Sequence, residues 1–214
     1  TERLTIGFAR RFATYKRGDL IFSDPDRLEK LLDQGVQIVY AGKAHPADQK
    51  GQAIIARILA FVRQPRFRDR VVFIPDYDMA IGRLLTACCD VWLNNPRRPR
   101  EASGTSGQKA AMNGNLNLSI LDGWWPEGFD GDNGWAIEDG RDPAFVEADA
   151  TLHELDAEDA LGLYKVLEDS VVPAFADKNR WARMSAHAMT TCAPAFNTHR
   201  MVGDYARDIY ARQR

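Results

Sequence analysis

Four cationic side chains lie close together in the segment ARRFATYKR, near the start of the chain. They are Arg10, Arg11, Lys16 and Arg17, and they directly follow a short apolar run with the composition of a strand. If a helix follows that strand, its free backbone amides and its dipole already favour anions at this turn. Arginine and lysine add charge-assisted hydrogen bonds to such a site. We therefore expect an anion-binding site with phosphate as the natural ligand; a solvated basic patch is the alternative.

A second segment, EASGTSGQKAAMNG, combines small residues, hydroxyl groups and a lysine. Small residues before a helix let backbone amides approach an anion, and Ser103, Thr105 and Ser106 add hydroxyl donors. The glycine spacing matches neither a P-loop nor a dinucleotide-binding fingerprint. Lys109, early in this helix, is suited to be a point-charge ligand of a phosphate or a lysine that forms a Schiff base. The residues alone predict an anion site and leave its ligand unnamed.

Short apolar runs alternate with helical patterns along the first two-thirds of the chain. This alternation predicts an α/β fold with a Rossmann-like, doubly wound parallel sheet and helices on both faces. Ligands of such sheets bind at the carboxyl ends of the strands, where both anion-binding segments fall. The expected strands are residues 4–9, 36–42, 71–76, 91–95 and 116–121, with GWAI as a sixth, and the expected helices are residues 19–32, 47–63, 79–88 and 106–113.

Beyond Gly140 the pattern changes to an acidic, irregular stretch followed by three helical segments. These segments lie near residues 157–169, 175–190 and 197–212, and we expect them to pack on the α/β body without forming a second core. The chain is therefore predicted to be one domain. Residues 1–140 would form the cofactor- and phosphate-binding core, and residues 141–214 the acidic connection and the packed helices.

Composition excludes several classes of protein. A net charge of −2 gives no reason to expect nucleic acid or anionic lipid as a partner, and no apolar run approaches the ~20 residues of a membrane span. The first residues lack the pattern of a signal peptide. Cys88, Cys89 and Cys192 lack metal-ligand spacing and are expected to be buried, reduced thiols, which fits a cytoplasmic protein. The four histidines form no ligand pair, so we expect no metal.

Other notable residues have structural interpretations. Trp124 and Trp125 are suited to stack on a sugar ring, although packing against the late helices or another domain is favoured. Asp78 is expected to cap the helix of residues 79–88, and His45 to be a satisfied loop histidine. A structural or interdomain network is expected from three arginines, Arg97, Arg98 and Arg100.

The segment EASGTSGQKAAMNGNLNLSILDG is very similar to the pyridoxal-phosphate segment of glycogen, starch and maltodextrin phosphorylases. ARRFATYKR resembles the phosphate-binding motif of the same family. VQIVYAGKAHP, VVFIPDYDMAIGRLL, DVWLNNPRRPREASGTSG and LDGWWPEGFDGDNGWAI match in the expected order, from about residue 5 to residue 137. The resemblance, strongest to the short bacterial and archaeal type, implies the C-terminal domain of a two-domain GT-B glycosyltransferase fold, without its N-terminal domain.

The resemblance also implies roles for individual residues. Lys109 corresponds to the lysine that binds pyridoxal 5′-phosphate as an internal aldimine. Thr105 and Ser106 match the residues that hold the phosphate of the cofactor. Arg11 and Lys16 match the pair that contacts the substrate phosphate beside it. Two neighbouring phosphates repel each other, so a site for both needs such cations.

Three further positions match sugar-binding residues of the family. Glu101, Ser103 and Gly104 correspond to positions that hydrogen-bond the glucosyl unit. The sequence departs from the family at Gln108, where a methionine usually precedes the cofactor lysine. Glutamine is similar in length, so we expect the cofactor to be retained. The larger departure is the absent N-terminal domain, which supplies the other wall of the cleft.

The implied activity is that of an α-1,4-glucan phosphorylase, which releases glucose 1-phosphate from glycogen or maltodextrin with orthophosphate. Its implied partners are the glucan, orthophosphate or glucose 1-phosphate, and the missing N-terminal domain; a homo-oligomer is left open. The isolated chain is expected to be inactive and to hold the cofactor weakly or not at all. The alternatives are a nucleotide-sugar-dependent glycosyltransferase similar to glycogen synthase and a non-catalytic glucan-binding module.

Overall fold

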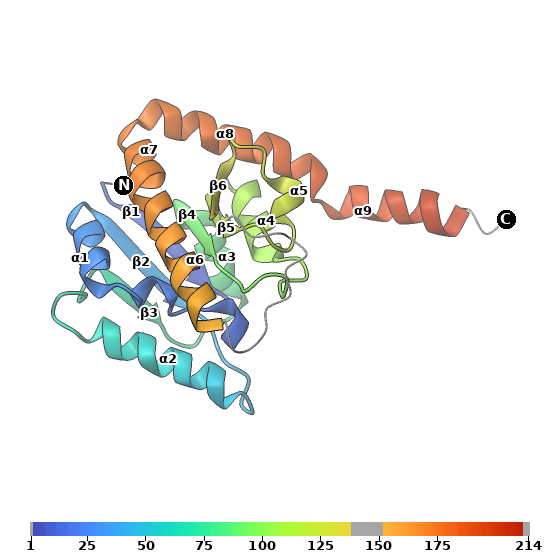
Figure 1. Ribbon diagram of the computed structural model, residues 1–214. Coiled ribbons are helices and arrows are strands. Elements are labelled where there is room, and N and C mark those ends of the chain that lie inside the picture. Colours follow the sequence, from blue (N-terminus) through green and yellow to red (C-terminus); the bar gives the residue numbers. More distant parts are fainter. Residues whose placement is uncertain (1, 138–151, 212–214) are drawn as a thin grey trace.

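The computed structural model describes residues 2–137 and 152–211, and a six-stranded sheet forms its centre (Figure 1). All neighbouring strands pair in parallel, in the order β3-β2-β1-β4-β5-β6. This order confirms the doubly wound fold, because β1 is flanked by β2 and β4 and the winding reverses there. The strands are β1 (Leu4–Ala9), β2 (Val36–Ala41), β3 (Val71–Ile74), β4 (Val91–Asn94), β5 (Leu116–Ile120) and β6 (Gly134–Ile137).

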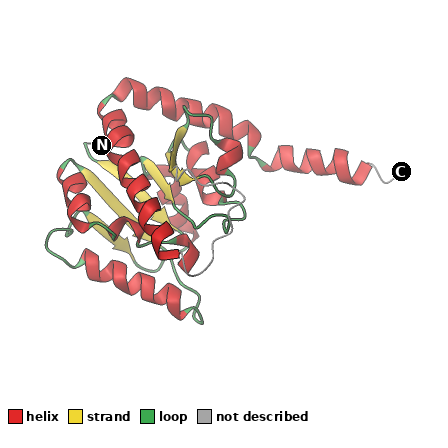
Figure 2. Cartoon of the chain, in the orientation of Figure 1, coloured by secondary structure: helices red, strands yellow, loops and turns green. Residues whose placement is uncertain are grey.

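Helices cover both faces of the sheet (Figure 2). One face packs against α1 (Pro25–Asp33), α2 (Gln49–Val62) and α6 (Leu152–Val166), and the other against α3 (Met79–Cys88) and α4 (Thr105–Met112). Every residue of β4 and β5 is buried, as expected of central parallel strands covered on both sides. A short helix, α5 (Trp125–Gly128), follows β5.

The helix expected at residues 19–32 is interrupted. A single 3₁₀ turn, η2 (Leu20–Phe22), comes first, and α1 begins only at Pro25. The residue before a proline is disfavoured in helical conformation, so the chain breaks at Asp24, whose carboxylate caps α1 by accepting a hydrogen bond from the Arg27 amide at 3.0 Å. Asp78 caps α3 in the same way, through the Ile81 amide at 2.8 Å, and this expectation is confirmed.

The late helices divide into a packed part and a projecting part. The long helix α6 continues through a π-helical turn, η4 (Leu167–Val171), and α7 (Val172–Ala176), and α8 (Lys178–Ala195) then lies against α4. The last segment differs from the expectation of packing on the body. Helix α9 (Thr198–Tyr205) and the turn η5 (Ala206–Tyr210) have no buried residue and project from the body in Figure 1.

Part of the expected organisation falls outside the described residues. The acidic connection lies largely within residues 138–151, so the division of the chain at residue 140 stays a prediction. Cys89 and Cys192 are buried as expected, but Cys88 is exposed, because it lies on the outer side of the last turn of α3. None of the helices within residues 2–137 and 152–211 combines the length and the hydrophobicity of a membrane span.

Candidate functional site

The sheet order brings the loops after β1 and β4 together at the carboxyl edge of the sheet. Lys16 ends the 3₁₀ turn η1 (Thr14–Lys16), and its Nζ forms an ion pair with Oε2 of Glu101 in the loop before α4. The two side chains are only 11 % and 7 % exposed. The structure thus brings a predicted phosphate ligand and a predicted sugar ligand, 85 residues apart in sequence, into direct contact.

Arg10 ties the end of β1 to the end of β4. Its guanidinium donates to the Leu93 carbonyl at 2.8 Å and to the Asn94 side chain, and it lies over the Phe8 ring at 4.8 Å from the ring centre. Burial lowers the pKa of Arg10 to about 10, and the nearby Glu101 carboxylate opposes this shift. Arg10 therefore remains cationic at neutral pH and adds positive potential beside Glu101.

The expected cluster of four cations is divided by the fold. Arg11 is exposed, and no residue in the described part of the chain forms an ion pair or hydrogen bond with its side chain. Arg17, in contrast, is buried and bound to the Asn95 and Pro96 carbonyls and to carboxylates of α6. Arg17 is therefore not an anion ligand. The expectation that all four cations of this segment bind an anion is wrong for Arg17.

The turn after β5 shapes the segment that carries Glu101. The Glu101 amide donates to Oδ2 of Asp122 at 2.8 Å, and the Trp124 amide donates to the Ser103 carbonyl at 2.8 Å. Burial raises the pKa of Asp122, and the hydrogen bonds from Glu101 and Gly123 partly offset that shift. Asp122 was not singled out from the sequence as a site residue; its position two residues after β5, at the edge where ligands bind, was the available signal.

The start of α4 exposes backbone amides at the same edge. Gly104 is the N-cap, with a left-handed backbone (φ 85°) that favours glycine, and no side chain caps the helix. The amides of Thr105 and Ser106 have no acceptor among residues 2–137 and 152–211. Uncapped amides at a helix N-terminus are suited to an anion. The Ser106 hydroxyl accepts a hydrogen bond from the Trp92 indole at 3.3 Å, and Thr105 is exposed.

A close contact with β5 fixes the position of α4. The Asn117 side chain donates to the Gly107 carbonyl at 3.1 Å. A Cβ at Gly107 would lie 2.7 Å from Oδ1 of Asn117 and 2.8 Å from Nε1 of Trp124, so only glycine fits without a shift. Lys109 lies on the exposed side of this helix, and its Nζ makes no ion pair or hydrogen bond with any described residue. Its amine is therefore accessible and unengaged.

The structure also decides the expectations for the two tryptophans, for Arg97 and for His45. Trp124 and Trp125 are 3 % and 0 % exposed, and the Trp124 ring contacts Phe196 at the end of α8, with 4.9 Å between centroids. They are packing residues and form no sugar platform. Arg97 forms an ion pair with Asp156 of α6, which confirms its structural role. His45 is an exposed loop residue whose Nδ1 accepts from the Ala47 amide at 3.1 Å, as expected.

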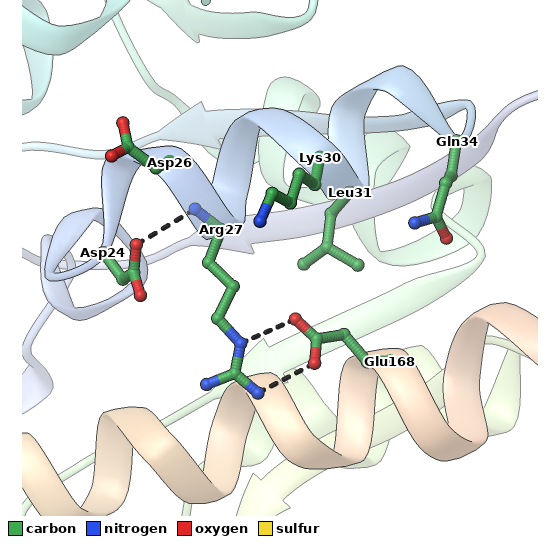
Figure 3. A pocket seen from close by; sticks show the side chains of 7 residues that line it. All are labelled: Asp24, Asp26, Arg27, Lys30, Leu31, Gln34 and Glu168. Atoms are coloured by element: carbon green, nitrogen blue, oxygen red, sulfur yellow. Dashed lines mark hydrogen bonds and ion pairs between the residues drawn. The ribbon is translucent and has the colours of Figure 1, made fainter.

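A hollow of about 670 Å³ lies between α1 and η4, away from this edge (Figure 3). Arg27 of α1 spans it and donates two hydrogen bonds to Glu168, at 2.7 and 2.8 Å. This pairing raises the pKa of Arg27 and joins α1 to η4, so the hollow is a structural junction. Its lining residues are Asp24, Asp26, Arg27, Lys30, Leu31, Gln34 and Glu168. Within the described residues, no group of His, Cys, Asp or Glu side chains is arranged to hold a metal ion.

Known proteins resemble this chain over nearly its whole length. Glycogen phosphorylase of Mycobacterium tuberculosis is 46% identical over 217 residues, which is 97% of this chain and 24% of that protein. Maltodextrin phosphorylase of Thermococcus litoralis is 45% identical over 213 residues (98% and 25%). Glycogen phosphorylase of Aquifex aeolicus is 44% identical over 221 residues (99% and 31%). The chain thus spans 24–31% of the length of these relatives.

The match to a protein family covers the same edge of the sheet. Residues 16–125 match the family described as "Carbohydrate phosphorylase". The matched segment begins at Lys16 and contains Glu101, the start of α4 and Lys109. The chain belongs to the carbohydrate phosphorylase family.

Proposed function

We propose that this chain carries the cofactor- and phosphate-binding half of the cleft of an α-1,4-glucan phosphorylase. The whole protein would release glucose 1-phosphate from glycogen or maltodextrin with orthophosphate. The observation that carries the proposal is the buried contact of Lys16 with Glu101, beside the uncapped start of α4. The names of the relatives support the same activity.

The residues at this edge fit pyridoxal 5′-phosphate. Lys109 has an exposed amine without a partner in the described part of the chain, as covalent binding of an aldehyde requires. The amides of Thr105 and Ser106 are open to an anion. In the proposal, Lys109 holds the cofactor covalently and Thr105 and Ser106 bind its phosphate. Once bound, the cofactor would supply a phosphate group next to the substrate phosphate, as a proton relay or an electrostatic partner.

The cations after β1 would bind orthophosphate. Arg11 is exposed and unpaired among the described residues, so it can form a bidentate contact with a phosphate. Lys16 is held in place by Glu101 and has further N–H groups to donate to a second anion. Their charges would offset the repulsion between substrate and cofactor phosphates, which is strong at short range.

The sugar would bind to the segment between β4 and α4. In the proposal, the Glu101 carboxylate accepts hydrogen bonds from glucosyl hydroxyls, and Ser103 and the Gly104 backbone add polar contacts. The remainder of the longer protein would supply the other wall of the cleft and the glucan acceptor site. A cytoplasmic location is part of the proposal, because the buried thiols of Cys89 and Cys192 are unpaired.

Phosphorolysis by the full-length protein tests the proposal. With maltodextrin and orthophosphate it should form glucose 1-phosphate, and Lys16→Met should lower kcat/KM by about 10²–10³-fold, as loss of a charge-stabilising donor typically does. Lys50→Met, at an exposed lysine of α2, is the matched control and should change little. Transfer from UDP- or ADP-glucose without phosphorolysis would favour the glycogen synthase-like alternative and contradict the proposal.

A further inference from the structure

Arg17 directly follows the phosphate-side residue Lys16, yet its side chain is only 3 % exposed. Its backbone is left-handed, with φ 48° and ψ 48°, which is uncommon for a residue other than glycine. A cation so deeply buried must have its N–H groups satisfied, because an unpaired buried charge is strongly destabilising. The partners of Arg17 therefore show what the residue does.

The first set of partners belongs to the loop after β4. Nε of Arg17 donates to the Asn95 carbonyl at 2.9 Å, and Nη2 donates to the Pro96 carbonyl at 2.9 Å. In return, the Asn95 side-chain amide donates to the Arg17 carbonyl at 3.0 Å. The Arg97 amide adds a bond to the Tyr15 carbonyl at 2.7 Å. Four hydrogen bonds thus join the segment around Lys16 to the segment that leads to Glu101.

The second set of partners belongs to helix α6. Nη1 of Arg17 donates to Asp156 at 3.0 Å and also forms an ion pair with Asp159, whose side chain is 2 % exposed. Asp156 also accepts a hydrogen bond from Nε of Arg97 at 3.0 Å. Two carboxylates of α6 therefore hold an arginine from each loop. These carboxylates offset the buried charge of Arg17. Among the four cations of residues 10–17, Arg11 is the exposed one.

We propose that Arg17 is a positioning residue: it sets Lys16 opposite Glu101 by holding the loop after β1 against the loop after β4. Asp156 and Asp159 in turn fix the Arg17 guanidinium. This inference rests on the proposed function for the role of Lys16. The planar guanidinium has five N–H groups and can serve two carbonyls and two carboxylates at once, whereas a lysine ammonium has three and no planar geometry.

Arg17→Lys in the full-length protein tests the inference. Displacement of a catalytic group by about 1 Å can cost roughly 10²-fold in rate. We expect the KM for orthophosphate to rise at least about 10-fold when it is measured well below the melting temperature of the variant. The KM for maltodextrin should change less. Hydrogen exchange of the peptide covering residues 95–101 should become faster. Arg57→Lys is the matched control: Arg57 pairs with Asp19, but its side chain is 55 % exposed, and both readouts should stay at the wild-type level.

A second variant keeps the test decisive if Arg17→Lys does not fold. Asp156→Asn removes a partly exposed partner of Arg17 and should shift both readouts in the same direction by a smaller factor. A lower melting temperature with unchanged KM for phosphate and unchanged exchange would overturn the inference. If the wild-type protein forms no glucose 1-phosphate, the proposed function fails, while the exchange of residues 95–101 still decides whether Arg17 positions the loop.

Discussion

The effects of substituting Lys16 and Glu101 on stability should be strongly coupled, because the two side chains form a buried ion pair. Removal of one partner of a buried ion pair typically costs about 3–5 kcal/mol, because the other charge is left in a poorly solvated place. Lys16→Met would leave the Glu101 carboxylate, 7 % exposed, without its cation. The guanidinium of Arg10 lies close enough for Glu101 to influence its pKa, so it offsets part of the loss. We therefore expect a destabilisation of about 3 kcal/mol, at the lower end of that range.

A second substitution separates the charge effect from the loss of packing. Adding Glu101→Gln removes the unpaired charge, so the double variant should be more stable than Lys16→Met alone, with a coupling energy of about 2 kcal/mol. Native-state hydrogen exchange of the full-length protein, read on peptides from β1 and β4, gives the local free energies of opening. Lys165→Met breaks an exposed pair with Asp169, 76 % and 60 % exposed, and should cost at most about 0.5 kcal/mol. Equal effects of Lys16→Met and Lys165→Met, or a double variant no more stable than Lys16→Met, would show that the buried pair is not coupled in this way.

Three further perturbations have defined outcomes. Gly107→Ala should destabilise the protein by about 1–2 kcal/mol, because the added Cβ would clash with β5. Gly203→Ala, with open space around the added Cβ, should stabilise α9 by up to about 1 kcal/mol. Thermal unfolding of both variants shows whether their stabilities change in these opposite directions. Burial raises the pKa of Cys89 to about 12, so alkylation of Cys89 at pH 8.5 should be at least about 100-fold slower than in the denatured protein and should accelerate as the pH rises. Mass spectrometry of iodoacetamide labelling measures both rates, and comparable rates in the folded and denatured protein would contradict the burial of this thiol. The raised pKa of Asp122 means that its ionisation opposes folding: this cost is absent below the ordinary aspartate pKa and grows as pH rises through the raised value. The melting temperature of wild type relative to Asp122→Asn should therefore fall from about pH 4 to pH 7, whereas the exposed control Glu127→Gln should show no such trend; a constant difference for Asp122→Asn would contradict the assignment.

The sheet was predictable because its strands are short, mainly apolar runs that alternate with helical patterns, and β2 and β3 are also rich in β-branched residues. The first strand and the third helix begin and end at the predicted residues, Leu4–Ala9 and Met79–Cys88. The helix expected at residues 19–32 failed at a proline whose position favours a helix start over a helix interior. Helix α9 was expected to pack on the body, yet none of its residues is buried. An amphipathic pattern identifies an apolar face, but it does not show which part of the protein covers that face.

The sequence predicted at which edge of the sheet the site lies. It did not predict which side chains of the site form ion pairs and hydrogen bonds with one another. Switch-point topology places the loops after β1 and β4 side by side, so contact between them followed from the fold. Charge alone did not separate Arg11, which is exposed, from Arg17, which α6 neutralises. The partners of Arg17 on α6 lie about 140 residues further along the chain, and local pattern carries no information about such contacts.

The proposed function depends most directly on covalent binding of the cofactor to Lys109. The full-length protein should be reduced with sodium borohydride, digested and analysed by peptide mass spectrometry, with Lys109→Arg and an unreduced sample as controls. We expect a phosphopyridoxyl group on Lys109 in the reduced wild-type protein and on no peptide of either control. A reduced wild-type protein with no adduct, or with its adduct on another lysine, would show that Lys109 does not bind the cofactor.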